Sequence, residues 1–172
     1  MSEIALPKVD KSILVKKKEI IKSLSKLINS ENILSEADEV RPYETDALSV
    51  YTQTPLAVVL PENTKQVSDI LKYCYKKDIK VVPRGAGTGL SGGALPLQDA
   101  ILLGLGKFNK ILEIDYENKC VVTQPGVTNL GITHAVEHKG FYYAPDPSSQ
   151  LACSIGGNVA ENSGGVHSLK YG

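Results

Sequence analysis

Glycine is distributed very unevenly along the chain. All 15 glycines of the 172 residues follow Arg84, and Arg84–Gly93 reads RGAGTGLSGG. Glycine lets the main chain adopt positive φ or come close to a bulky group. Such a loop can turn successive N–H groups toward one anion, to which Thr88 and Ser91 add hydroxyl donors. We expect the ligand of this loop to be a phosphate group. The alternative is a purely structural turn, but such a turn needs fewer glycines.

A second glycine cluster lies near the end of the chain. Gly156 and Gly157 precede a short helical segment expected over residues 158–162. N–H groups at a helix start have no partner within the helix, so both glycines should point free donors at a ligand. Two backbone anion sites far apart in sequence favour one long ligand with phosphates at its middle. A loop followed by a capped helix remains the alternative.

Three known motifs are matched in part and rejected. Gly87–Gly92 fits G-x-G-x-x-G, but no helix opens after the loop, as a Rossmann fingerprint requires. The chain has no Gly-Lys-Ser/Thr of a Walker A loop. His134–His138 reads HAVEH, a zinc motif that lacks a third ligand on a later helix. We therefore predict no metal site.

The hydrophobic pattern predicts an α+β fold. A helix should begin after Asp10, and residues 56–82 should form a βαβ unit whose two strands pair in parallel. Residues 100–105, 111–115 and 120–124 are expected to form an antiparallel meander of hairpins. A further helix should run over residues 128–139 and stop at Gly140.

Composition excludes several classes of protein. A formal net charge of +0 and 42% hydrophobic residues fit neither a disordered chain nor a partner of nucleic acid. The three cysteines form no C-x-x-C pair, and no signal peptide or membrane span is evident. These features predict a cytoplasmic protein without a direct membrane span.

Four ordered segments resemble the FAD-binding domain of FAD-linked oxidases, the superfamily of vanillyl-alcohol oxidase and PCMH-type flavoproteins. They are Val82–Pro96, Gln124–Val127, Tyr142–Ser149 and Ser154–Ala160. The resemblance covers roughly residues 40–172 and is strongest to the bacterial glycolate oxidase branch. It implies a helical segment over residues 1–40, then an FAD-binding domain over 41–172. That domain would contain a βαβ subdomain and an antiparallel-sheet subdomain with FAD between them.

The same resemblance implies the residues that contact FAD. They are Arg84, Gly85, Ala86, Gly87, Thr88, Gly89, Ser91, Gly92, Gly126, Pro145, Asp146, Ser148, Ser149, Gly156, Gly157, Asn158, Ala160 and Asn162. Covalent members attach the flavin to a histidine in the first glycine loop, and this loop has none. Noncovalent FAD is therefore expected, with Cys153 as a weak alternative attachment point.

The resemblance also implies an activity. Members of the glycolate oxidase branch oxidise small 2-hydroxy acids, so the resemblance implies oxidation of such an acid, most closely glycolate to glyoxylate. Other glycolate oxidase subunits would accept the electrons and provide any membrane association. D-lactate or D-2-hydroxyglutarate is the alternative substrate, and a nucleotide-phosphate binding module without redox activity is the alternative function. Because members continue past Gly172 into a substrate domain, the sequence is expected to be an N-terminal fragment. We name no catalytic residue.

Overall fold

The computed structural model of the chain describes residues 6–171, which form two compact units. Unit 1 contains the described residues up to Pro83 together with Leu90–Leu103. Unit 2 contains Arg84–Gly89 and the described residues from Gly104 onward. The first glycine loop therefore contributes residues to both units, and each unit is described by itself.

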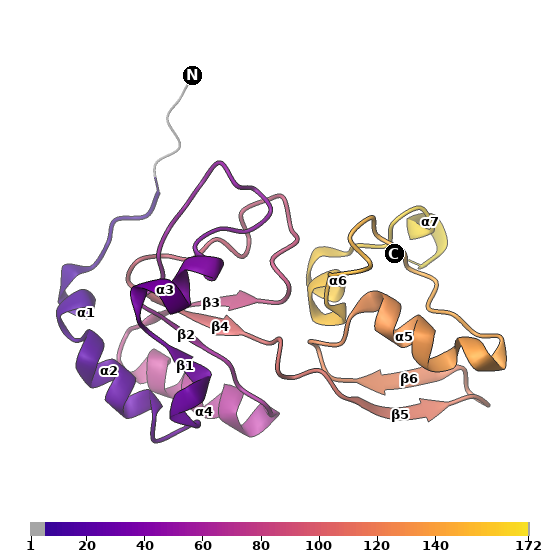
Figure 1. Ribbon diagram of the computed structural model, residues 1–172, viewed down its shortest axis with the longest axis horizontal. Helices are drawn as coiled ribbons and strands as arrows, with labels where there is room; N and C mark the ends of the chain where they lie inside the picture. The colour runs from indigo at the N-terminus through magenta and orange to yellow at the C-terminus, as the bar shows by residue number, and fades with distance from the viewer. Residues whose placement is uncertain (1–5, 172) are drawn as a thin grey trace. The chain divides into compact units, whose positions relative to one another are not determined.

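Unit 1 is built on a four-stranded sheet with the strand order β1-β2-β4-β3 (Figure 1). Its strands are β1 (Ile33–Leu34), β2 (Ala57–Val59), β3 (Lys80–Arg84) and β4 (Ala100–Gly104). β1 pairs antiparallel with β2, and β2 pairs parallel with β4, with Val58 opposite Leu102. Every residue of β4 is buried, which explains its continuous apolar sequence.

The strand order corrects two predictions. The strands on either side of the helix in residues 56–82 do not pair with each other, because β4 lies between them. β4 is apolar on both faces and takes the central position, whereas β3 carries Pro83, which cannot donate to a neighbour and suits an edge. Since β4 joins this sheet, the expected meander is reduced to a single hairpin in unit 2.

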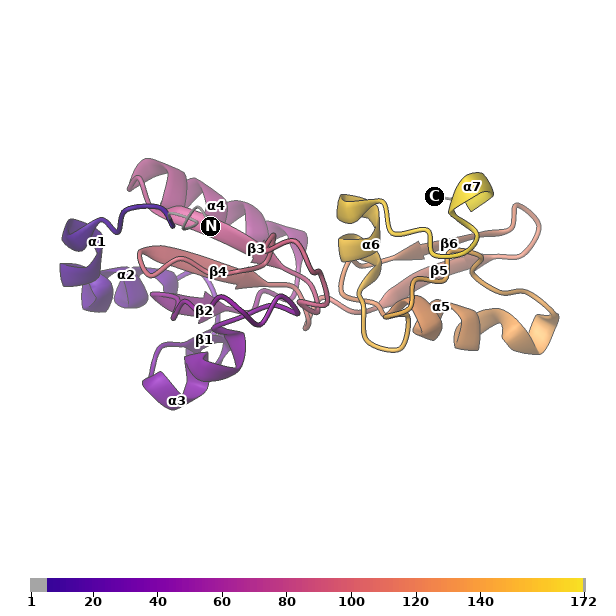
Figure 2. The same cartoon turned by 90° about the horizontal axis from the view of Figure 1, so that it is seen from above.

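Helices cover both faces of this sheet (Figure 2). α4 (Thr64–Lys76) is capped by the Asn63 side chain and buries Ile70 and Cys74. Leu71 of the same helix is 43% exposed. On the opposite face, α3 (Ala37–Val40) and the 3-10 turn η2 (Arg41–Tyr43) pack Val40 and Tyr43 against the strands. The 3-10 turn η1 (Ser30–Asn32) leads into β1.

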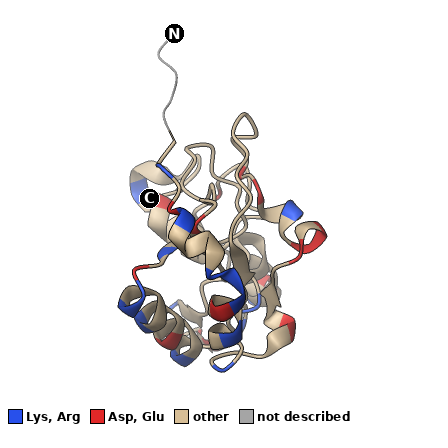
Figure 3. Cartoon of the chain, turned by 90° about the vertical axis from the view of Figure 1, so that its left-hand side faces the viewer, with Lys and Arg blue, Asp and Glu red and all other residues tan. Residues whose placement is uncertain are grey.

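The N-terminal helix is broken in two. Asp10 caps it as predicted, with its carboxylate 2.8 Å from the Ser12 amide nitrogen. The helix then divides at Lys16 into α1 (Lys11–Val15) and α2 (Lys17–Leu24). Acidic and basic positions are interspersed on the part of the chain facing the viewer in Figure 3, as expected of a solvated surface.

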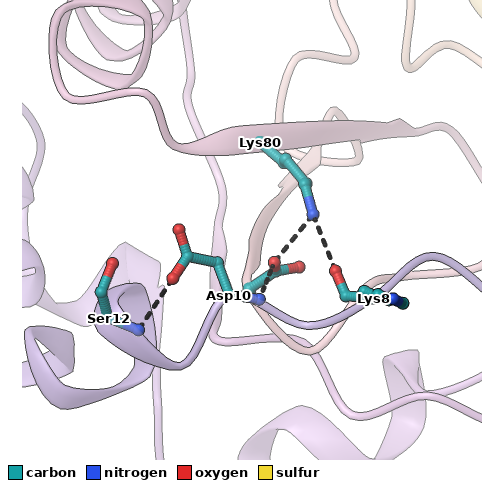
Figure 4. Close-up of polar contacts among 5 residues, drawn as sticks. Lys8, Asp10, Ser12 and Lys80 are labelled. Carbon is teal, nitrogen blue, oxygen red and sulfur yellow. Dashed lines mark hydrogen bonds and ion pairs between the residues drawn. The ribbon is translucent and has the colours of Figure 1, made fainter.

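A buried carboxylate anchors the start of the described chain to the sheet (Figure 4). The Asp99 side chain is 2% exposed and lies 2.8 Å from the Lys80 ammonium on β3. The same oxygen accepts the Asp10 amide at 2.7 Å, and Lys80 also reaches the Lys8 carbonyl at 3.5 Å. Asp99 therefore holds residues 8–10 against β3.

Replacing Asp99 with asparagine should weaken this anchor. Burial raises the pKa of Asp99, but hydrogen bonds from Lys80 and the Asp10 amide outweigh it and lower the pKa overall. A lowered pKa adds stability above the unfolded value, 3.8, and this stability is lost as the pH falls through the folded pKa. We expect Asp99→Asn to cost roughly 2 kcal/mol at pH 7, and to flatten the acid limb of the stability curve.

Denaturant unfolding at pH 7 and below pH 4 measures both effects. Asp69→Asn removes the exposed i,i+4 pair with Lys65 and is the matched control, for which we expect little change. Equal effects of the two substitutions would contradict the anchoring role.

Unit 2 begins with the hairpin of β5 (Ile111–Asp115) and β6 (Cys120–Thr123), as the sequence predicted. α5 (Asn129–Val136) follows, capped by the Thr128 hydroxyl, and continues as η3 (Glu137–Lys139). Gly140 ends it at φ 77°, which confirms the predicted helix stop. Two short helices complete the unit, α6 (Ile155–Glu161) and α7 (Ser168–Tyr171).

Candidate cofactor site

The backbone of the first glycine loop offers a row of unused donors. None of the N–H groups of Gly85–Gly93 donates a hydrogen bond to any residue between 6 and 171. Gly85, Gly87–Gly89 and Gly92 are half-buried, and half-buried amides normally have a partner, so this set of unused donors is unusual. The loop can therefore give its amides to a ligand without breaking any bond of the protein.

The two glycine clusters meet within unit 2. A Cβ at Gly85 would collide with the Ser154 hydroxyl oxygen and lie 3.9 Å from the Gly157 amide nitrogen. Only glycine lets the loop come this close to the first turn of α6. The sequence predicted that both clusters serve one site, and the structure brings Gly85 and Gly157 together.

Two buried polar side chains point to a ligand at this meeting place. Ser154 is 5% exposed and Asn158 is 6% exposed. The Ser154 hydroxyl oxygen and the Asn158 amide nitrogen have no hydrogen-bond partner among the described residues. An unpaired buried polar atom is costly, so a ligand that pairs with both atoms would be bound favourably.

Sequence reasoning missed Ser154. A serine before a helix start is normally read as an N-cap, and Ser154 does occupy that position. Its side chain makes no capping bond, however, and abuts Gly85 instead. Only the placement of the distant glycine loop makes this serine a candidate.

The second cluster differs from the prediction in one respect. α6 begins at Ile155, so Gly156 and Gly157 lie inside its first turn rather than before it. The amides of Ile155 and Gly156 donate at 2.8 Å to the Val127 and Pro125 carbonyls. The Gly156 donor is therefore not free, because residues 125–127 run beside the helix start; the Gly157 amide has no such partner within residues 6–171.

Gly126 also has a packing role. Its amide donates to the Phe108 carbonyl at 2.8 Å. A Cβ here would collide with the Leu105 carbonyl oxygen and lie 2.8 Å from that of Phe108. The Gly126 amide is thus already used by the protein.

Charge divides the first loop into two ends. Arg84 is buried, and its guanidinium occupies the space that a Gly87 Cβ would need. At the other end, the Glu161 carboxylate oxygens lie 3.0 and 3.3 Å from the Cβ position of Gly89. An anion is therefore favoured between Gly85 and Gly87 and repelled near Gly89. Ser91 and Gly92 belong to unit 1.

The segment Pro145–Ser149 is held by hydrogen bonds inside unit 2. The Asn129 side chain donates a hydrogen bond to the Pro145 carbonyl at 2.8 Å. The Asp146 carboxylate oxygen Oδ1 lies 3.0 Å from His167 Nδ1 and forms an ion pair with that histidine when it is protonated. The Ser149 carbonyl accepts amides from the following turn. Ser148 is exposed, as are Ala160 and Asn162 at the end of α6. Burial of Tyr143 raises the pKa of its hydroxyl.

Unit 2 also contains an apolar groove of about 410 Å³. Its lining includes Tyr116, Ile132, Phe141, Tyr143, Ile155 and Val159, but no residue of the glycine loop.

No group of three or more His, Cys, Asp or Glu within residues 6–171 could hold a metal ion. None of the helices in that range is both long and apolar enough to cross a membrane.

Comparison with known proteins identifies the family. Residues 55–172 match the family described as an FAD binding domain. The chain belongs to this FAD binding domain family. FAD is therefore its cofactor, and the unused loop amides, the unpaired Ser154 and Asn158 atoms and the Gly85 cradle suit the phosphates and hydroxyls of that cofactor.

Relatives of this FAD binding domain include named oxidases and dehydrogenases. The chain is 53% identical to glycolate oxidase subunit GlcD of Escherichia coli K12, covering 98% of this chain and 32% of that protein. It is 33% identical to the mitochondrial D-2-hydroxyglutarate dehydrogenase of Arabidopsis thaliana, covering 85% of this chain and 26% of the relative. The chain thus spans about a third or less of the length of these relatives.

A solved structure confirms the fold. The crystal structure of p-cresol methylhydroxylase with substrate bound matches 88% of this chain and 30% of its own, at a TM-score of 0.72 and 23% identity. The predicted α+β fold of PCMH type is therefore confirmed. The residues assigned to FAD and the boundary at residue 41 stay predictions.

Proposed function

We propose that the whole protein uses FAD to oxidise a small 2-hydroxy acid, most favourably glycolate to glyoxylate. The observation that carries the FAD site is the row of unused amides over Gly85–Gly89 together with the unpaired Ser154 and Asn158 atoms, with Gly85 in contact with Ser154. The 53% identity to a glycolate oxidase subunit over nearly the whole chain supports the substrate. We also propose that residues 41–172 belong to the FAD-binding domain and that residues 1–40 precede it as an N-terminal helical segment.

The pyrophosphate of FAD should bind at the Gly85–Gly87 end of the loop. There it would receive hydrogen bonds from loop amides, the Ser154 hydroxyl, the Gly157 amide and the Asn158 side chain. Arg84 would contribute positive charge from its guanidinium, which lies at the Cβ position of Gly87. Since Glu161 lies at Gly89, we do not place a phosphate at that end.

The chain's own residues bind and orient the cofactor. Bound FAD supplies the acceptor for a hydride equivalent from the α-carbon of the hydroxy acid. Rigid amides and hydroxyls that lose no bonds on binding fix the cofactor at little reorganisation cost. The match covers 32% of the GlcD relative. We propose that the groups that recognise the hydroxy acid belong to the part of the protein that corresponds to the rest of that relative. We propose that other subunits accept the electrons. This is supported by the name of the GlcD relative, which describes it as a subunit of glycolate oxidase.

D-2-hydroxyglutarate is the second candidate substrate. It is favoured by the 33% identity to the plant dehydrogenase of that name, which covers most of this chain. D-lactate has no comparable support among the relatives described above.

The whole protein, purified with its flavin, tests the function. Glycolate should bleach the visible flavin bands without oxygen and reduce an artificial electron acceptor, faster than D-2-hydroxyglutarate or D-lactate. Acid precipitation should leave the FAD in the supernatant, because we propose noncovalent attachment. A folded whole protein without flavin bands would instead support the nucleotide-phosphate module without redox activity.

A further inference from the structure

Unit 1 also contains a buried polar atom without a partner, in Asp46. Asp46 is 4% exposed. One carboxylate oxygen accepts the Leu48 amide at 2.9 Å. The other carboxylate oxygen has no hydrogen-bond partner among the described residues. A buried carboxylate oxygen without a donor is one of the costlier features that a folded chain can keep.

The loop that carries Asp46 is closed by its own hydrogen bonds. The Gln53 amide donates to the Glu44 carbonyl at 2.8 Å, and the Thr45 hydroxyl donates to the Tyr51 carbonyl at 2.9 Å. Asp46 is therefore fixed in place rather than free to turn toward solvent. Its unpaired oxygen needs a donor from outside the loop.

The same loop lies beside the part of the glycine loop that belongs to unit 1. The Leu48 side chain is 3.9 Å from the Cβ position of Gly92. Figures 1 and 2 show residues 44–53 next to the segment that follows Leu90. Ser91 and Gly92 also have amides without a partner in the described chain. The unpaired Asp46 oxygen thus lies in a loop that borders candidate ligand-binding backbone.

We propose that Asp46 accepts a hydrogen bond from a hydroxyl or N–H donor of bound FAD, an inference that rests on the proposed function. A carboxylate can pair only with a donor, so the phosphates and ring carbonyls of FAD are excluded as partners. The flavin half offers the ribityl hydroxyls and the ring N3–H, and the adenosine half offers the ribose hydroxyls and the adenine amino group. Asp46 is then a cofactor-positioning residue whose lone buried oxygen is satisfied on binding.

Asp46→Asn in the whole protein tests this proposal. Asparagine keeps the oxygen that accepts the Leu48 amide but replaces the unpaired, charged oxygen with a neutral amide group. Losing a charge-assisted hydrogen bond should raise the FAD dissociation constant about tenfold. Removing an unpaired buried charge should at the same time raise the melting temperature of the FAD-free protein. If Asp46 had a purely structural role, its replacement would lower the melting temperature, and weaker FAD binding would not be accompanied by a higher one.

Asp38→Asn is the matched control, because Asp38 is exposed on α3 in the same unit. It should leave both measurements unchanged. Competition with FMN, which is the flavin half, and with ADP, which is the adenosine half, then shows which half of FAD supplies the donor, because only the competitor that carries it should lose affinity in the variant. Unchanged FAD binding in Asp46→Asn, or a loss of binding together with a lower melting temperature, would overturn the proposal. If the unaltered whole protein binds no FAD, the proposed function fails instead.

Discussion

A whole protein with Gly87 replaced by valine should purify without FAD. Gly87 has φ +75°, a conformation that a β-branched residue adopts only with strain, and its Cβ position is occupied by the Arg84 guanidinium. Valine would displace Arg84 and turn neighbouring amides away from the phosphates. We expect the FAD dissociation constant to rise at least about 100-fold. Flavin absorbance per mole of purified protein measures the loss.

Gly106→Val is the control for this result. Gly106 lies in unit 2, has no atom within 4 Å of its Cβ position and has no positive φ. It should therefore keep its FAD. Melting of the FAD-free proteins separates failure to bind from failure to fold. A well-folded Gly87→Val protein carrying one FAD per chain would refute the assignment of this loop.

Gly126→Ala should destabilise the protein whether or not FAD is present. The new Cβ would collide with the Leu105 carbonyl oxygen and crowd that of Phe108, and both are backbone atoms that cannot swing away. Overpacking against backbone should lower the free energy of unfolding by about 2–3 kcal/mol. Denaturant unfolding of the whole protein, with and without added FAD, provides the measurement.

Gly106→Ala again serves as the matched variant, with no stability loss expected from contacts. If Gly126 acted mainly through the cofactor, its substitution would reduce FAD affinity and leave the stability of the FAD-free protein unchanged. That outcome would support the sequence-based prediction that Gly126 contacts the cofactor.

Local signals in the sequence were sufficient for much of the fold. Asp10 caps its helix as expected, because a cap is made by residues close in sequence, and Asn63 and Thr128 are caps of the same local kind. Gly140 ends its helix for the same reason. The hairpin of β5 and β6 was also predicted, since its turn is short.

The order of the strands in the sheet of unit 1 was harder to predict from the sequence. Residues 100–104 are apolar throughout, a pattern that fits a buried strand in either a meander or a central parallel position. Only the pairing of β4 with β2, more than forty residues earlier in the chain, decides between them. Partners of this kind are selected by packing of the whole unit, so no local pattern reveals them.

The glycine content by itself predicted that this chain presents backbone to a phosphate-bearing ligand, and the ordered motifs determined the FAD binding domain family. The tertiary structure decided which glycine amides remain available: Gly157 keeps its donor, while Gly126 and Gly156 use theirs within the protein. It also brought Ser154 to Gly85 and buried one oxygen of Asp46 without a partner. The physical reason is that a residue type fixes which hydrogen bonds are possible, whereas contacts between distant segments fix which of them are already made.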